Sequence, residues 1–184
     1  MPAESYEQTV ARWRSEASAR RWNPLRLVAV FVVVFLALQS SWEACRGSVL
    51  ERLLIDTATV EPAAWVIDKL SPGTEVRAQA NAIVSTTGRI NVLNGCEGLE
   101  LAFLLTAAFL AYPMPWRQRG IGITGSLLLA YLANQLRLVV LWFAYAHDRE
   151  LFALIHGTVG PLILVALCLL YFLLFIGRDA VRRS

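Results

Sequence analysis

Residues 121–146 read IGITGSLLLAYLANQLRLVVLWFAYA, an apolar run of helical length that Asn134, Gln135 and Arg137 interrupt. A helix that crosses a membrane needs about 20 mostly apolar residues, and this run is long enough. The whole chain has the same character, because 57% of its 184 residues are hydrophobic and 17% are charged. A soluble domain has about 45–50% apolar and about 25% charged residues. We therefore expect an all-α membrane protein.

Three more apolar runs complete a predicted four-helix transmembrane bundle with a small external α/β insert between its first two spans. The predicted spans cover residues 25–42, 96–114, 120–146 and 157–176. They are joined by the external insert at residues 43–95, a cytoplasmic loop at 115–119 and an external loop at 147–156. A chain of this length leaves no room for a large soluble domain beside four spans.

The arginines indicate the orientation of the bundle. Few acidic residues but many basic ones lie before span one or at its inner edge, between spans two and three, and after span four; the basic ones are Arg12, Arg14, Arg20, Arg21, Arg26, Arg117, Arg119, Arg178, Arg182 and Arg183. Positive charge in short segments stays cytoplasmic. We therefore expect both termini inside a cytoplasmic (inner) membrane, with a cytoplasmic segment at residues 1–24 and a basic cytoplasmic tail at 177–184. Tryptophans near the predicted span ends are interpreted as interfacial anchors: Trp22, Trp42, Trp116 and Trp142.

The external insert combines helical and strand patterns. Ser48–Ile55 and Pro62–Leu70 carry apolar residues at helical spacing, and residues 76–84 alternate between apolar and mostly polar side chains. A turn signal at Ser85–Gly88 precedes the apolar residues at 90–93, which predicts a hairpin. About fifty residues are too few for a strong independent core, so we expect the insert to lie on the outer surface of the membrane.

Charge and cysteine content exclude several classes of function. The net charge is +3, but the arginines are spread in short groups between apolar runs, which favours membrane lipid over nucleic acid as a partner. The three cysteines, Cys45, Cys96 and Cys168, form neither a disulfide framework nor a zinc-binding pattern. We expect no metal and no cofactor.

Arg137 is the residue whose presence in an apolar run most needs an explanation. An arginine near the centre of a membrane costs about 2.5–3.5 kcal/mol on insertion scales, and such charges mark functional sites. Counting about 1.5 Å per residue from Gly120 puts Arg137 roughly 26 Å along its span, near the outer boundary of the hydrocarbon core. Asn134 lies three residues earlier and shares its helix face, whereas Gln135 points elsewhere. The structural alternative is an arginine that reaches the outer headgroups or ties helices together.

Cys96 lies where the chain re-enters the membrane after the insert. Asn94 with Glu97 three residues later resembles a capping box, which predicts a helix start with Cys96 in its first turn. The positive end of the helix dipole favours the nucleophilic thiolate, whereas Glu97 and Glu100 favour the neutral thiol. The alternatives are an inert buried cysteine and a disulfide with Cys45.

His156 stands at the outer start of span four, and a single histidine there is more often structural than catalytic. The predicted topology nevertheless brings Cys96, Arg137 and His156 to one depth on one side of the membrane. A thiol beside an imidazole and a guanidinium is a workable acyl-transfer site. The thiolate attacks a carbonyl, histidine protonates the leaving amine, and arginine stabilises the oxyanion or orients the peptide.

At these residues the chain resembles the exosortase/archaeosortase family of membrane transpeptidases. The resemblance rests on Cys96-Glu97-Gly98, on Asn134-Gln135-Leu136-Arg137, and on His156 with Gly160 four residues later. It covers about Asn91–Ile176 and implies a compact four-span member of that family.

The resemblance implies a role for each site residue: Cys96 as nucleophile, Arg137 as oxyanion or positioning residue, and His156 as general acid/base. Asn134, Asn94 and Glu97 are expected to support the site. The implied substrate is a secreted protein whose C-terminal sorting tail holds a short motif, a transmembrane helix and a basic cluster. The enzyme would cut outside that helix and pass the protein to an acceptor of unknown identity. The competing hypothesis is a non-enzymatic membrane scaffold or assembly factor with a structural Arg137 and a Cys45–Cys96 disulfide.

Overall fold

The computed structural model describes residues 24–86, 88–93 and 95–183, with side chains up to residue 178. Most of the expected N-terminal segment and the candidate residue Asn94 lie outside the described residues. The helices are α2 (Pro24–Ala44), α3 (Val49–Arg52), η1 (Leu53–Val60), α4 (Glu61–Leu70), α5 (Leu99–Ala111), α6 (Trp116–His147), α7 (Arg149–Leu154), η2 (Ile155–Val159) and α8 (Gly160–Arg183), where η marks a π-helical segment. The strands are β1 (Arg77–Gln79), β2 (Ala82–Val84) and β3 (Arg89–Asn91).

The chain is a mostly helical membrane protein. Among the described residues, three helical segments are long and apolar enough to cross a membrane: α2, α6, and the continuous run Arg149–Arg178 through α7, η2 and α8. The remaining expected span, residues 96–114, corresponds to α5, which has 13 residues. At about 1.5 Å per residue this helix is about 20 Å long, shorter than a hydrocarbon core of about 30 Å. The four-span count therefore stays a prediction.

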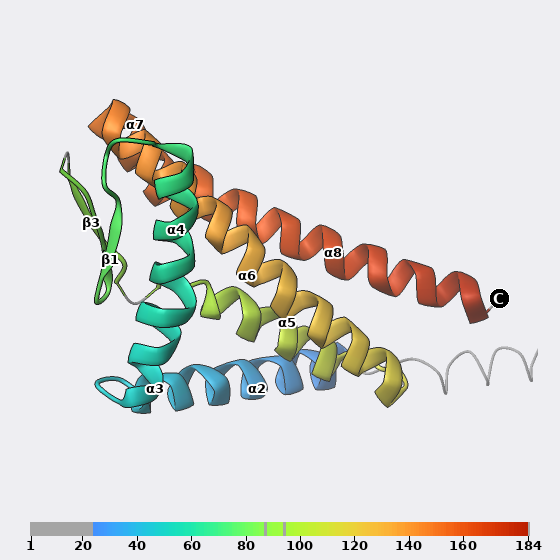
Figure 1. Ribbon diagram of the computed structural model, residues 1–184. Helices are drawn as coiled ribbons and strands as arrows, with labels where there is room; N and C mark the ends of the chain where they lie inside the picture. The colour runs from blue at the N-terminus through green and yellow to red at the C-terminus, as the bar shows by residue number, and fades with distance from the viewer. Residues whose placement is uncertain (1–23, 87, 94, 184) are drawn as a thin grey trace, which may run out of the picture.

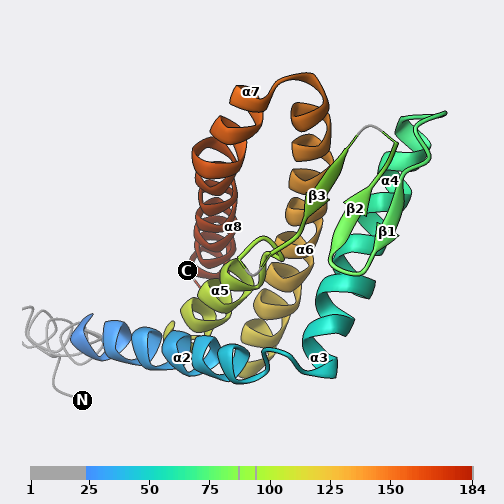
Figure 2. The same cartoon turned by 90° about the vertical axis from the view of Figure 1, so that its left-hand side faces the viewer.

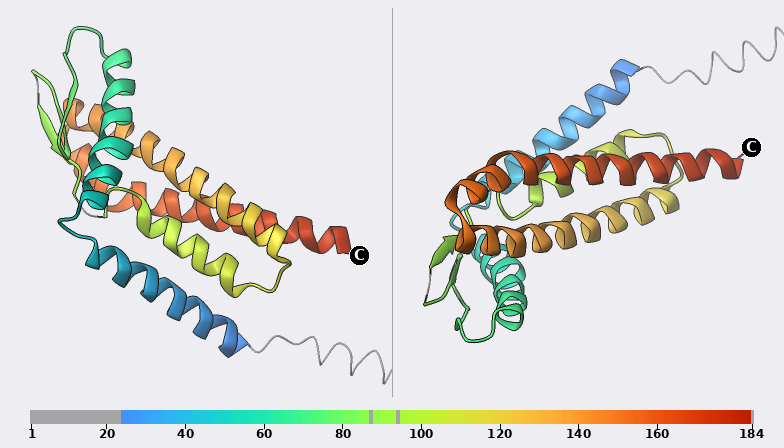
Figure 3. Two further views of the ribbon diagram at one scale, coloured as in Figure 1. Left: turned by 60° about the horizontal axis from the view of Figure 1, so that its bottom comes forward. Right: turned by 90° about the horizontal axis from the view of Figure 1, so that it is seen from above.

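Helices α2, α5, α6 and α8 lie side by side, with α5 in contact with the other three. The first residues of α2 and the end of α8 lie at the same end of this bundle (Figures 1 and 3). The opposite end is covered by a cap layer, which we define as residues 49–91. Figure 2 shows the cap layer with α4 on one side, β3 toward α6, and β2 between β3 and β1.

The cap layer follows the predicted pattern with two differences. The two predicted helical stretches form one continuous helical run, because η1 connects α3 directly to α4. The turn at Ser85–Gly88 joins β2 to β3, and the Ser85 N–H donates to the Gly88 carbonyl at 2.9 Å. The predicted first strand is broken into β1 and β2, because Ala80 adopts a left-handed conformation with φ of 50° and reverses the chain.

The predicted external loop at residues 147–156 is wrong in its conformation. Only Asp148 interrupts the helices, and its side chain caps α7 by accepting from the Glu150 N–H at 2.8 Å. His156 consequently lies inside a continuous helical run instead of at a helix start. Helical geometry therefore determines which way His156 projects.

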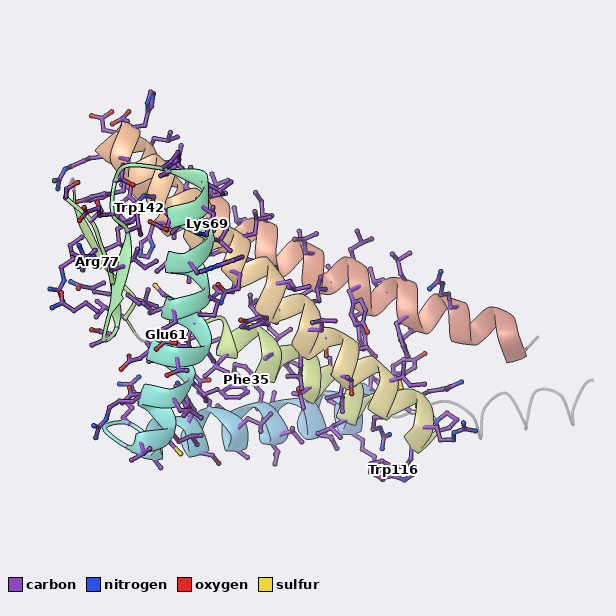
Figure 4. The ribbon with its side chains drawn as sticks, in the orientation of Figure 1. Phe35, Glu61, Lys69, Arg77, Trp116 and Trp142 are labelled. Atoms are coloured by element: carbon purple, nitrogen blue, oxygen red, sulfur yellow. The ribbon has the colours of Figure 1, made fainter. Side chains whose placement is uncertain are left out.

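The main core lies at the junction of bundle and cap layer. Trp42 from α2, Ile67 from α4, Ile83 from β2 and Trp142 from α6 are buried in one cluster. The interpretation of Trp42 and Trp142 as interfacial anchors is therefore wrong, since both rings pack inside the protein. Trp116 is 76% exposed and lies at the end of the bundle far from Trp142 (Figure 4), as an anchor should.

Candidate active site

The site is built around residues 134–137 of α6, whose polar side chains reach three different segments. Asn134 is buried, and its side-chain amide Nδ2 donates to the main-chain carbonyl of Cys96 at 2.9 Å. The same side chain packs on Gly98, where an added Cβ would lie 2.8 Å from the Asn134 Cβ. Asn134 therefore holds the cysteine loop directly against α6.

Cys96 lies in a turn before α5 and not in the helix. Its N–H donates to the Leu93 carbonyl at 2.9 Å, and α5 begins at Leu99 with Gly98 as its N-cap at φ of 80°. The prediction that a capping box starts the helix near Cys96 is therefore wrong. The helix-dipole effect is concentrated in the first turn, so α5 favours the Cys96 thiolate less than the sequence suggested.

Glu97 is buried beside the nucleophile candidate. Its Oε1 accepts a 3.1 Å hydrogen bond from the Trp42 Nε1 at the end of α2. The second oxygen, Oε2, is buried and has no hydrogen-bond partner among the described residues. This contact ties α2 to the cysteine loop, and nothing in the sequence pattern around Trp42 pointed to it.

Arg137 binds the main chain of His156. Its Nη2 donates to the His156 carbonyl at 3.4 Å. That carbonyl is available because η2 has π-helical bonding, in which each N–H binds the carbonyl five residues earlier: the Gly160 N–H binds the Ile155 carbonyl. The next residue is Pro161, which has no N–H to offer to His156.

Gln135 makes the equivalent contact to the cap layer. Its Nε2 donates to the Ala58 and Thr59 carbonyls of η1 at 3.4 and 3.2 Å. Here too a proline follows the π-helical segment, since Pro62 is at the start of α4. Pro62 has no N–H to offer to the Ala58 carbonyl four residues earlier, as α-helical bonding would require. The sequence correctly predicted that Gln135 points away from Asn134 and Arg137 but did not show what it binds. The sequence signal for these two contacts was the pair of prolines, because each proline lacks the N–H that an earlier carbonyl in its helix would otherwise bind.

An aromatic chain orients the His156 ring. The ring stacks on Phe152, one turn earlier, with centroids 5.4 Å apart and planes 4° apart. Phe152 packs edge-on against Tyr145 of α6, and Tyr145 in turn lies against Gly88 at the tip of the β2–β3 hairpin. The cap layer is therefore linked to the His156 ring through Tyr145 and Phe152.

The electrostatics of the Cys96 loop favour a neutral thiol. Burial is the largest cause that raises the pKa of Cys96 above its ordinary value, and the negative charges of Glu97 and Glu100 act in the same direction. The positive charge of Arg137 is the largest opposing effect, and a hydrogen bond between the thiol and the Leu93 backbone acts in the same direction. At neutral pH Cys96 is therefore a thiol whose ionisation requires a base, and Arg137 makes that ionisation easier.

Several buried polar atoms at the site have no partner among the described residues. They are Glu97 Oε2, Asn134 Oδ1, Gln135 Oε1, Arg137 Nε and His156 Nδ1. A buried polar atom without a hydrogen bond costs about 1–3 kcal/mol, so each of these atoms is a candidate partner for a polar group of a bound substrate. Cys45, Cys96 and Cys168 are all free thiols, so the disulfide that the scaffold hypothesis requires is not formed.

Comparison with known proteins identifies the family. The family model described as transmembrane exosortase (Exosortase_EpsH) matches residues 22–173, which is most of the chain. This match extends beyond the stretch on which the sequence resemblance rested and includes α2 and the whole cap layer. No curated protein matches the chain, and no solved structure matches it. On the extent of the family match, the chain belongs to the transmembrane exosortase family.

Proposed function

We propose that the protein is a membrane-embedded cysteine transpeptidase that cleaves the C-terminal sorting tails of exported proteins and transfers them to an acceptor. The observation that carries this proposal is the attachment of both Cys96 and His156 to one turn of α6. Asn134 holds the Cys96 carbonyl and Arg137 holds the His156 carbonyl. Family membership supports the same chemistry.

The first half of the reaction forms a thioester. His156 takes the proton from the Cys96 thiol, because the buried thiol beside Glu97 does not ionise readily by itself. The thiolate Sγ attacks the scissile carbonyl carbon, and the Arg137 guanidinium stabilises the oxyanion that develops. The buried Nε–H of Arg137 has no partner among the described residues and is the donor we assign to this role. The C–N bond then breaks, and His156 returns the proton to the leaving amine.

The second half releases the exported protein. An acceptor amine or a water molecule attacks the thioester carbonyl, loses a proton to His156, and regenerates the Cys96 thiol. The cleaved tail keeps its transmembrane helix and its basic cluster. We place the cap layer and Cys96 on the outer face of the inner membrane, with both termini in the cytoplasm, because an exported substrate must be cut on that side.

The test measures cleavage of an exported reporter protein. The reporter carries a C-terminal sorting tail that is encoded in the same genome as the chain. Cys96→Ala, Arg137→Ala and His156→Ala should each abolish cleavage, while immunoblots show that the variants still accumulate in the membrane. Cys168→Ala removes a thiol far along α8 and serves as the matched control that keeps activity. Unchanged cleavage by Cys96→Ala would overturn the mechanism.

A further inference from the structure

A groove at the edge of the cap layer lies next to the site but outside the catalytic arrangement. Its volume is about 630 Å³, within the range of about 300–1,000 Å³ typical of ligand sites. One wall is formed by the turn after α2 together with α3 and η1, and the facing wall by the β1–β2 turn and by Val92 and Leu93. No step of the proposed reaction uses these residues.

The helical wall of the groove carries two charged side chains that have no hydrogen bond or ion pair within the described part of the chain. Arg46 pairs with Glu43, and the Glu51 carboxylate accepts the Gly47 N–H at 2.5 Å. Arg52 and Asp56 also line the groove, yet neither side chain has a hydrogen bond or ion pair among the described residues. They therefore present a donor and an acceptor to whatever enters the groove.

Two covalent or hydrogen-bonded connections join the groove to the catalytic residues. Leu93 is 62% exposed, lines the groove, and accepts the Cys96 N–H through its carbonyl. The helical wall is attached from the other side, since Gln135 binds the Ala58 and Thr59 carbonyls of η1. Both walls are therefore fixed in position relative to the cysteine loop and to α6.

We propose that this groove binds the extended peptide segment on the acyl side of the scissile bond, and that Arg52 and Asp56 contact its polar groups. This inference rests on the proposed function, because it takes a tail-anchored exported protein as the substrate. The substrate's own helix stays in the membrane, so the chain on the acyl side must leave Cys96 across the cap layer. Leu93 supplies an apolar contact, and Arg52 and Asp56 supply the donor and the acceptor that an extended main chain or a polar side chain requires.

The test uses the full chain and the tail-bearing reporter, reconstituted together in phospholipid vesicles. Arg52→Glu and Asp56→Lys should each raise the apparent KM for the reporter by about fivefold or more, with a smaller change in kcat, because they remove binding and not chemistry. The matched controls are Arg77→Glu and Glu75→Lys. These residues form an exposed ion pair at the start of β1 and line a separate cavity of about 450 Å³. Figure 4 labels Arg77 beside the strands.

Photo-crosslinking locates the bound segment. A photoreactive residue at position 52 or 93, in a Cys96→Ala background that cannot cleave, should crosslink to reporter residues on the acyl side of the cleavage site. The same probe at Gln79, in the separate cavity, should not. Equal crosslinking from all three positions, or unchanged KM in both groove variants, would overturn the groove assignment. Cleavage that persists in Cys96→Ala would instead overturn the proposed function, so the two failures are distinguishable.

Discussion

The side-chain amide of Asn134 donates to the main-chain carbonyl of Cys96 at 2.9 Å, and this bond sets the position of the cysteine relative to α6. One turn later on the same helix, Arg137 binds the His156 carbonyl. Both reactive side chains are therefore positioned through their main chains, which leaves the thiol and the imidazole available for chemistry. The arrangement makes α6 the reference element of the site.

Replacing Asn134 by leucine tests this positioning role. Leucine has a similar volume but no donor, so the Cys96 carbonyl loses its partner, at a cost of about 1–3 kcal/mol. We expect kcat for reporter cleavage to fall by about tenfold or more, with little change in KM, because the nucleophile is displaced while substrate binding is kept. Ser126→Ala is the control, since Ser126 is buried in the same helix but donates only to the Ile123 carbonyl. Equal losses in the two variants would contradict a specific role for Asn134.

Two glycines in the same helical run should differ sharply in their tolerance of alanine. A Cβ at Gly160 would lie 2.6 Å from the Ile155 carbonyl oxygen and 3.3 Å from the Arg137 Nε. Gly160→Ala should therefore shift η2, loosen the Arg137–His156 contact and lower reporter cleavage. A Cβ at Gly157 meets no atom within 4 Å, so Gly157→Ala should cleave at nearly the wild-type rate. Similar cleavage by both variants would show that the contact at Gly160 is unimportant.

The reactivity of Cys96 toward iodoacetamide should depend on two neighbouring charges in opposite ways. The thiolate is the reactive form, so a higher pKa lowers the rate at a given pH. Arg137→Gln removes a charge that lowers the Cys96 pKa and should move the midpoint of the rate–pH profile upward, whereas Glu97→Gln should move it downward. The measurement uses a Cys45→Ala and Cys168→Ala background, so that only Cys96 reacts. Shifts in the same direction for both variants would contradict the assigned electrostatics.

The Trp42–Glu97 hydrogen bond should stabilise the junction between α2 and the cysteine loop. Trp42→Phe removes the donor and leaves the buried Glu97 side chain without a hydrogen-bond partner among the described residues, which should cost about 1–3 kcal/mol of unfolding free energy. Glu97→Leu removes the acceptor, and the double variant should be more stable than the sum of the two single losses predicts, because no unpaired group then remains. Thermal unfolding in detergent measures these differences. Trp65→Phe, at a 65% exposed position, is the control, and additive losses would argue against the bond.

The sequence by itself determined the membrane class, the approximate positions of the apolar helices, the hairpin at β2–β3, and the candidate set Cys96, Arg137 and His156. These features depend on composition, on local periodicity and on the cost of a charge in an apolar run, which are all readable along one chain. The resemblance to exosortases was also present in the sequence, since its motifs are short and ordered.

Only the tertiary structure decided how those residues meet. The start of α5 at Leu99, the helical surroundings of His156, and the burial of Trp42 against Glu97 result from packing between segments far apart in the chain. The same holds for the two π-helical segments, each followed by a proline and each satisfied by a side chain from α6. A sequence shows where a proline removes a hydrogen-bond donor. The side chain that replaces this donor depends on which helix packs against the segment, and that packing depends on the tertiary structure.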